Sequence, residues 1–173
     1  MPAHAFVPDD FPVPQRATLG PFRLEPLGPR HNEADHAAWS SSIEHIRATP
    51  GFVGRGWPPV EGMSLEANLA DLERHRSDFD TRAGFTYTVL EGGEDGEDSE
   101  DGEDGAEGAD GDDGEVIGCV YIYPSRTQEH VTTVRSWVRA DRAEFDKPLY
   151  DAVSAWLRTD WPWPLPSIHY APR

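Results

Sequence analysis

The stretch of the sequence best suited to hold a ligand is residues 140–147, which connect a predicted strand to a predicted helix. In sheets covered by helices, ligands collect where the carboxyl end of a strand leads into a helix. The N-terminus of that helix attracts anions, because its first backbone N–H groups have no partners within the helix. The chemistry to expect here is therefore the binding of an anionic group.

Charged side chains of both signs surround this connection. The basic ones are Arg139, Arg142 and Lys147, and the acidic ones are Asp141, Glu144 and Asp146. Neighbouring like charges repel by an energy on the order of 1 kcal/mol at a protein surface. The carboxylates therefore oppose an incoming anion, and Asp146 at the helix start could itself supply the one anion that a helix end favours.

The predicted strand before this connection carries a second basic pattern. Arg135, Trp137 and Arg139 alternate with other residues and so share one face of the strand. Stacking of an arginine on the tryptophan accounts for the pattern. Contact between these arginines and an anion is the functional alternative.

Two other groups of residues could do chemistry. Metal-ligand residue types occur at the start of the first predicted helix: His31, Glu33, Asp35 and His36. Because two of them at most share a helix face, we expect no metal site there. Further along, Glu44 and His45 are suited to act as a general base near an amine, although a solvent-facing helix surface explains them as well.

Charge is distributed unevenly along the chain. Its 173 residues include 32 Asp and Glu against 15 Lys and Arg, a formal net charge of −17. Residues 91–115 hold fourteen of the acids and no base, so the remainder has a net charge of −3. A segment this polar cannot bury enough apolar surface to offset its ordering entropy, which predicts a disordered loop over residues 91–114. The absence of a basic patch in the sequence disfavours a nucleic-acid partner.

Several classes of protein are disfavoured by simple counts. No apolar run approaches 18 residues, and the N-terminal segment lacks the apolar region of a signal peptide. We therefore expect a cytoplasmic protein that does not bind membranes. The single cysteine, Cys119, excludes a disulfide framework.

Hydrophobic periodicity predicts the elements that position these residues. Strands are expected over residues 22–27, 85–90, 115–123, 132–139 and 167–170, and helices within residues 30–49, 64–83 and 146–157. Strict alternation in the third strand would place Val116, Gly118, Val120 and Ile122 on one face, and Ile117, Cys119, Tyr121 and Tyr123 on the other. Residues 1–20 are expected to form an extended arm, fixed by Phe6, Phe11 and Val13, and residues 21–173 a single domain.

This order of elements resembles that of the GNAT superfamily of acyl-CoA-dependent N-acetyltransferases. The match covers about residues 20–171, and its apolar positions are filled by Trp39 and Ile43, Phe85 and Tyr87, and the run Val116–Tyr123. The resemblance implies an α+β fold: a mixed, mostly antiparallel sheet of about five strands with three helices.

The family's most specific motif is a glycine-rich turn whose backbone N–H groups hold the pyrophosphate of CoA. Aligned on the helix residues Leu149, Val153 and Trp156, this turn falls on residues 141–146, where no glycine occurs. Side chains there would block close approach of the backbone to a phosphate. The resemblance then leaves acetyl-CoA to the strand and its basic neighbours: Trp137, Val138, Arg139, Arg142 and Lys147. The family's fourth helix, which often carries a tyrosine general acid, is not expected, so no catalytic residue is assigned.

The family binds its acceptor between the first two helices and the splayed strands. The residues that the resemblance places there are Trp39, Trp57, Tyr121 and Tyr123. Trp39 and Tyr121 also fit ordinary core positions, whereas Trp57 lies in a Gly/Pro loop, where core packing is less expected.

Two functions remain open from the sequence. One is an N-acetyltransferase that acts on a small amine with acetyl-CoA, in spite of the missing glycine turn. The other is a non-catalytic GNAT-like module that binds a ligand or a protein and self-associates as a homodimer through an open sheet edge.

Overall fold

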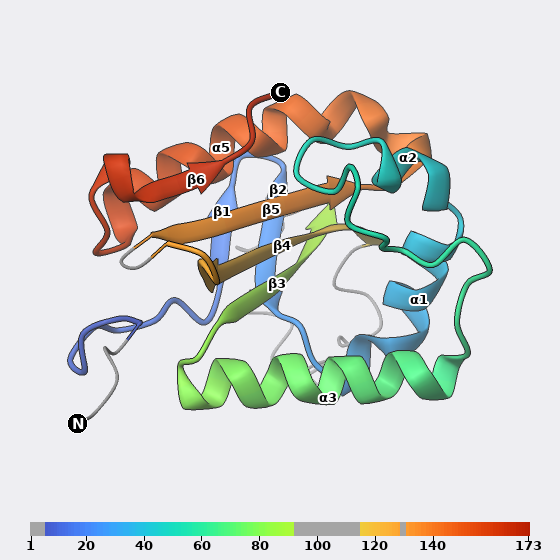
Figure 1. Ribbon diagram of the computed structural model, residues 1–173, viewed down its shortest axis with the longest axis horizontal. Helices are drawn as coiled ribbons and strands as arrows, with labels where there is room; N and C mark the ends of the chain where they lie inside the picture. The colour runs from blue at the N-terminus through green and yellow to red at the C-terminus, as the bar shows by residue number, and fades with distance from the viewer. Residues whose placement is uncertain (1–5, 92–114, 129–130) are drawn as a thin grey trace, which may run out of the picture.

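The computed structural model describes residues 6–91, 115–128 and 131–173 of the chain (Figure 1). A six-stranded sheet with the order β1-β2-β3-β4-β5-β6 forms its centre. The strands are β1 (Ala17–Leu19), β2 (Phe22–Pro26), β3 (Phe85–Glu91), β4 (Glu115–Pro124), β5 (Thr132–Val138) and β6 (Ile168–Tyr170). Successive strands from β1 to β5 are antiparallel and β6 is parallel to β5. The expected α+β class with a mostly antiparallel sheet is confirmed.

Helices cover both faces of this sheet, with α5 on one side and α1 and α3 on the other (Figure 1). The α-helices are α1 (Asn32–Ser40), α2 (Ile43–Arg47), α3 (Leu65–Thr81) and α5 (Asp146–Asp160). Short 3₁₀ turns are η1 (Pro29–His31), η5 (Ala140–Phe145) and η6 (Leu165–Ser167). The apolar stripe of α5 buries Leu149, Val153 and Leu157 against the sheet, as its 3–4 spacing predicts.

The described elements outnumber the predicted ones by one strand and one α-helix. The extra strand, β1, lies at residues 17–19 of the expected arm and pairs with β2. The first predicted helix is divided into α1 and α2 at Ser41 and Ser42. This break has a structural use, because the Ser42 hydroxyl accepts the backbone N–H of Ala140 at 2.7 Å and so ties α2 to the start of η5.

The N-terminal segment is fixed to the domain, as its aromatic residues predict. Phe6, Phe11 and Val13 pack against the core on the α5 side of the sheet. The Arg82 guanidinium donates to the carbonyl oxygens of Pro8 and Phe11 at 2.7 and 2.9 Å. These contacts hold the segment from residue 6 onward against the sheet.

A β-bulge in β4 corrects the predicted alternation of its side chains. Val89 pairs with Gly118 and Leu90 with Val116, so Ile117 is the extra residue. As a result Val116 shares a core cluster with Cys119, whereas Ile117 packs on the opposite side with Ile122. A Cβ at Gly118 would lie 2.3 Å from the carbonyl oxygen of Trp137, so glycine permits the close approach of β5 at this bulge.

The two strands that border the candidate site pair over part of their length. β6 pairs with Thr132–Val134 of β5, and Tyr170 is its last partner. Beyond Val134, β5 has β4 as its strand neighbour on one side and, within the described residues, no strand on the other. We call residues 135–138 the unpaired half of β5.

Two further expectations concern the rest of the chain. The acidic loop predicted over residues 91–114 lies outside the described residues, apart from Glu91 at the end of β3. Among the described residues, no helix has the length and apolar character needed to span a bilayer.

Candidate functional site

The predicted anion-binding connection is the 3₁₀ turn η5 between β5 and α5. Several of its backbone N–H groups already donate inside the protein. The N–H of Arg139 bonds to the carbonyl of Ile117 at 2.8 Å, and that of Arg142 bonds to the carbonyl of Arg139 at 2.9 Å. The N–H of Ala140 bonds to Ser42. These three groups are therefore not directed at a ligand.

The two arginines of the turn are paired with carboxylates. Arg139 donates to Asp141 through Nη2 at 2.7 Å and to Glu115 through Nη1 at 2.8 Å. Arg142 donates to Glu91 through Nε at 2.9 Å. The bond to Asp141, followed by that to Glu115, raises the pKa of Arg139, and the bond to Glu91 raises that of Arg142. Each guanidinium thus has its counter-charge within the chain.

The unpaired half of β5 is occupied by the side chain of Arg173. Its guanidinium donates through Nη2 to the backbone oxygen of Ser136 at 2.6 Å and through Nε to Asp146 Oδ2 at 2.7 Å. The Arg173 side chain is 4% exposed and lies 5.7 and 6.0 Å from the ring centres of Tyr150 and Tyr170. Arg173 therefore takes up the main-chain acceptor that a further strand or a ligand would use.

Asp146 was expected to be the N-cap of α5, but that position belongs to Phe145, and Asp146 is the first helical residue. Its carboxylate still lies at the positive end of the helix, where an anion is favoured. Oδ2 is bound to Arg173, and Oδ1 is buried without a hydrogen-bond partner in the described part of the chain. The anion that this helix end favours is thus supplied by the protein.

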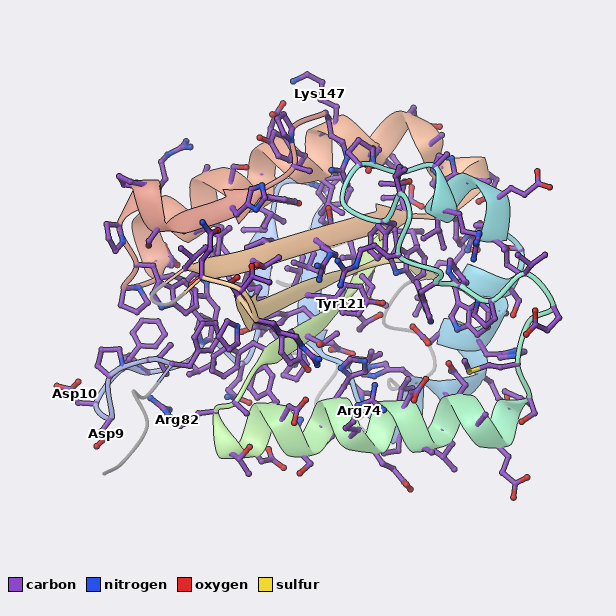
Figure 2. All side chains as sticks on the ribbon, viewed as in Figure 1. Asp9, Asp10, Arg74, Arg82, Tyr121 and Lys147 are labelled. Atoms are coloured by element: carbon purple, nitrogen blue, oxygen red, sulfur yellow. The ribbon has the colours of Figure 1, made fainter. Side chains whose placement is uncertain are left out.

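The other residues expected to bind acetyl-CoA do not converge. Trp137 and Val138 are fully buried in different core clusters, Trp137 on the α1 side and Val138 on the α5 side. Lys147 is 65% exposed and pairs with Asp151 on the outer surface of α5 (Figure 2). Of the five expected residues, only Arg139 and Arg142 lie together at η5, where both pair with Glu115 and Asp141.

Three of the four expected acceptor residues do gather on the α1 side of the sheet. The ring centre of Trp57 lies 5.6 Å from that of Trp39 and 6.4 Å from that of Tyr121. Trp137 completes the cluster by donating its indole N–H to the Tyr121 hydroxyl at 3.0 Å. Burial raises the pKa of the Tyr121 hydroxyl, so it stays protonated at neutral pH. The half-buried Trp57 thus packs against aromatic rings from α1, β4 and β5.

The fourth expected residue, Tyr123, belongs to a different group under α3. Its hydroxyl donates to Asp78 at 2.9 Å and lies 3.1 Å from His75 Nδ1. Burial lowers the pKa of His75 to about 4, so this imidazole is neutral at pH 7. This hydrogen-bonded group could not be predicted from local sequence patterns, because its members come from α3 and β4.

The two residues considered as a general base line a cavity. It has a volume of about 420 Å³ and lies where α2 meets the start of η5. Its lining residues are Ser41, Ser42, Ile43, Glu44, His45 and Ala140. His45 Nε2 is buried and has no hydrogen-bond partner in the part of the chain that the structure describes. Glu44 and His45 therefore lie beside the predicted ligand turn, and a base at this position stays a prediction.

The residues considered as metal ligands diverge. His31 Nδ1 accepts the backbone N–H of Gly28, so its Nε2 carries the proton and donates to Glu25 at 2.9 Å. His36 bonds to the backbone of Met63. Asp35 accepts a bond from Asn68 at 3.1 Å, and its burial raises its pKa to about 6. Within the described residues, no three His, Cys, Asp or Glu side chains are gathered as metal ligands would be.

Comparisons with known proteins add to this picture. No family model and no curated protein matches the sequence. Among solved structures, RimL, a ribosomal L7/L12 α-N-protein acetyltransferase in complex with coenzyme A, aligns with a TM-score of 0.56 at 10% identity, covering 84% of this chain and 70% of that one.

Two other solved structures align comparably. An acetyltransferase from Thermus thermophilus gives a TM-score of 0.52 at 12% identity over 88% of this chain and 74% of its own. The ribosomal-protein-S5-alanine acetyltransferase from Vibrio fischeri gives 0.52 at 9% identity over 83% and 67%. At identities this low the likeness establishes a shared fold.

Proposed function

We propose that this chain, which has the GNAT fold, is a ligand-binding protein in which the place for CoA is filled by the chain's own side chains. The observation that carries the proposal is the position of Arg173. Its buried guanidinium binds the Ser136 carbonyl in the unpaired half of β5 and Asp146 at the N-terminus of α5. In the family that the sequence resembles, the turn before this helix and the helix N-terminus hold the pyrophosphate of CoA.

The energy of these contacts supports the proposal. Breaking a buried ion pair and leaving its partner uncompensated costs about 3–5 kcal/mol. A ligand that had to displace Arg173 would bind roughly a hundredfold more weakly, or worse, than it would to a free site. The carboxylates of Asp141 and Asp146 add repulsion toward a pyrophosphate. CoA is therefore a poor ligand for this conformation.

A second candidate is an N-acetyltransferase that uses acetyl-CoA and acts on a small amine. A specific observation favours it: the Ser136 carbonyl is held by a side chain and not by a strand. Movement of Arg173 alone would therefore free it, without unpairing β6. Glu44 and His45, beside the cavity at η5, are then the candidates for the base that accepts the amine proton.

A thermal-shift titration with millimolar CoA separates the two candidates. A ligand at a hundred times its dissociation constant stabilises a protein by about 2.7 kcal/mol. We expect no shift for the wild type and a measurable shift for R173A, with R16A as the control, because Arg16 is an exposed arginine before β1. A clear shift for the wild type, together with acetyl transfer to an amine panel, would overturn the first proposal in favour of the second.

Self-association remains a prediction for either candidate. β6 is three residues long and borders the sheet, so it offers few backbone groups to a second copy. A dimer formed through this edge would therefore be weak. Sedimentation equilibrium over a range of concentrations measures the dimerisation constant. A protein that is monomeric at every concentration would contradict the predicted homodimer.

A further inference from the structure

Arg135 occupies a fixed position on the α1 side of β5. It lies directly across from Tyr121 in the register of β4 and β5. Its Nε donates to the backbone oxygen of Gly51 at 3.0 Å. Gly51 has a φ of +97°, a conformation that residues other than glycine rarely adopt. A Cβ atom at Gly51 would lie 3.5 Å from Arg135 Cγ, so the two residues are in contact. The loop after α2 thus orients the Arg135 side chain through one hydrogen bond.

The terminal nitrogens of Arg135 have no acceptor among the described residues. The Nε bond to Gly51 is the one hydrogen bond that its guanidinium makes there. A guanidinium with its two terminal N–H groups free matches the two oxygens of a carboxylate or phosphate. In the described part of the chain, one hydrogen bond therefore orients the Arg135 side chain, and its terminal N–H groups have no acceptor.

Two more arginines lie near Arg135. Arg55 belongs to the turn that begins at Phe52 and follows Gly51, and Arg126 follows the end of β4. Both act on Arg135, whose pKa is lowered first by burial and then by these two positive charges. In the described ranges 6–91, 115–128 and 131–173, none of the three forms an ion pair with a carboxylate. Among the described residues, these three positive charges thus have no carboxylate partner.

We propose that Arg135, Arg55 and Arg126, which we call the Arg135 corner, bind the oxyanion group, a carboxylate or phosphate, of a small-molecule ligand. The identification of this ligand as the protein's natural ligand rests on the proposed function, whereas the binding of an anion at the corner does not. Arg135 supplies the paired N–H groups, and the exposed Arg55 and Arg126 supply long-range attraction.

The surroundings of the corner favour a small ligand with a flat apolar part. Phe52 and Trp57 lie beside Tyr121, with ring centres 6.1 and 6.4 Å from it. Phe52 is buried and Trp57 is half-buried, so a planar group attached to the oxyanion would meet the Trp57 ring. Three arginines in a chain with a net charge of −17 make too small a basic surface for a nucleic acid. An aromatic carboxylate is the simplest compound with these features.

NMR spectroscopy of the ¹⁵N-labelled protein tests the proposal without any CoA. The Arg135 Nε–H group is fixed by its hydrogen bond to Gly51. Its NMR signal is assigned as the one that disappears in R135Q. The probes are benzoate, its neutral analogue benzamide, and inorganic phosphate, each added at constant ionic strength. We expect benzoate and phosphate to shift this signal and benzamide to leave it unchanged.

Two exposed variants keep the test independent of folding. R55Q and R126Q are expected to weaken benzoate binding by about three- to tenfold each, because each removes one nearby charge. R16Q, which changes an exposed arginine before β1, is expected to bind as the wild type does. An unmoved Arg135 signal, or equal affinity for benzoate in the wild type and in the R55Q/R126Q double variant, would overturn the inference. Because CoA is absent, either result leaves the account of Arg173 unaffected.

Discussion

Two groups of arginines on or beside the same strand differ in their partners. At η5, Arg139 and Arg142 are bound by Asp141, Glu115 and Glu91. At the Arg135 corner, no carboxylate within the described residues pairs with an arginine. The family resemblance pointed to the first group as the place for an anion. A basic residue at a helix start therefore predicts an anion site only after its carboxylate neighbours have been counted.

The pKa values of the two groups of arginines shift in opposite directions. Carboxylate partners raise the pKa of Arg139 and Arg142, because they favour the charged form. Burial and neighbouring positive charges lower the pKa of Arg135. An added anion would relieve the repulsion at the corner, whereas at η5 it would have to displace an existing partner.

The largest effect is expected where a charge pair is buried. R173A removes the partner of Asp146, whose Oδ1 is already unpaired, and should lower the free energy of unfolding by about 3–5 kcal/mol. Urea unfolding measures this loss. The double variant R173A/D146N should recover part of it, since no uncompensated carboxylate then remains. Equal stability of R173A and the wild type would show that this pair does not close the unpaired half of β5.

Asp35 is the acidic counterpart of Arg135: a charged group whose hydrogen-bond partner in the described residues is neutral. Asp35 is buried with Asn68 as its partner, and burial raises its pKa to about 6 from 3.8. The folded state then binds a proton more tightly than the unfolded state, so this contribution is present below about pH 4 and is lost as pH rises through about 6. The change amounts to about 3 kcal/mol.

Urea unfolding between pH 4 and pH 7 measures this contribution as the difference between the wild type and D35N. Asn can still accept the Asn68 bond, so D35N isolates the charge. The other titratable groups acting on Asp35 are His31, His36 and Asp71. A constant difference across this pH range would contradict the raised pKa.

Removing the carboxylates that pair with Arg139 should leave this arginine without a counter-charge among the described residues, as Arg135 is. In the double variant E115Q/D141N, Arg139 loses both of its ion pairs. Phosphate should then bind at η5 about three- to tenfold more tightly than in the wild type, because fewer negative charges oppose it. Arginine Nε–H shifts at constant ionic strength report the change. If phosphate binds η5 equally in both proteins, the carboxylates are not what excludes it.

The smallest effects are expected from the single substitutions of Arg139 and Arg135 in the absence of ligand. R139Q breaks exposed ion pairs and should lower Tm by about 1–3 °C. R135Q loses the bond to Gly51 but also removes a repelled charge, so its Tm should change less. Added 0.5 M NaCl should narrow the gap between the two variants, because it screens exposed charges. A larger loss for R135Q than for R139Q would reverse the comparison.

Local sequence patterns predicted much of the fold. The stripe of Leu149, Val153 and Leu157 located α5, and the strand periodicity located β3, β4 and β5. The bulge at Ile117 escaped the alternation rule, because its cause is the contact between Gly118 and the Trp137 carbonyl on the next strand. Gly118 inside an apolar strand was the available sign of it.

The candidate site was less predictable, because its key contacts join distant parts of the chain. The sequence located the turn at residues 140–146 and its mixture of charges. It gave no signal that Arg173 would reach Ser136 and Asp146, which lie 37 and 27 positions away along the chain. The strand periodicity predicted the face on which Arg135 lies, but the absence of a carboxylate partner within the described residues depends on which loops surround it.

Anomalous diffraction from crystals soaked in selenate would locate a bound anion, because selenate has the shape and charge of a small oxyanion and its position can be seen. We expect an anomalous peak at the Arg135 corner, within hydrogen-bond distance of the Arg135 terminal nitrogens, and none at η5. A peak at η5, with Arg139 or Arg142 released from its carboxylates and an empty Arg135 corner, would contradict this expectation.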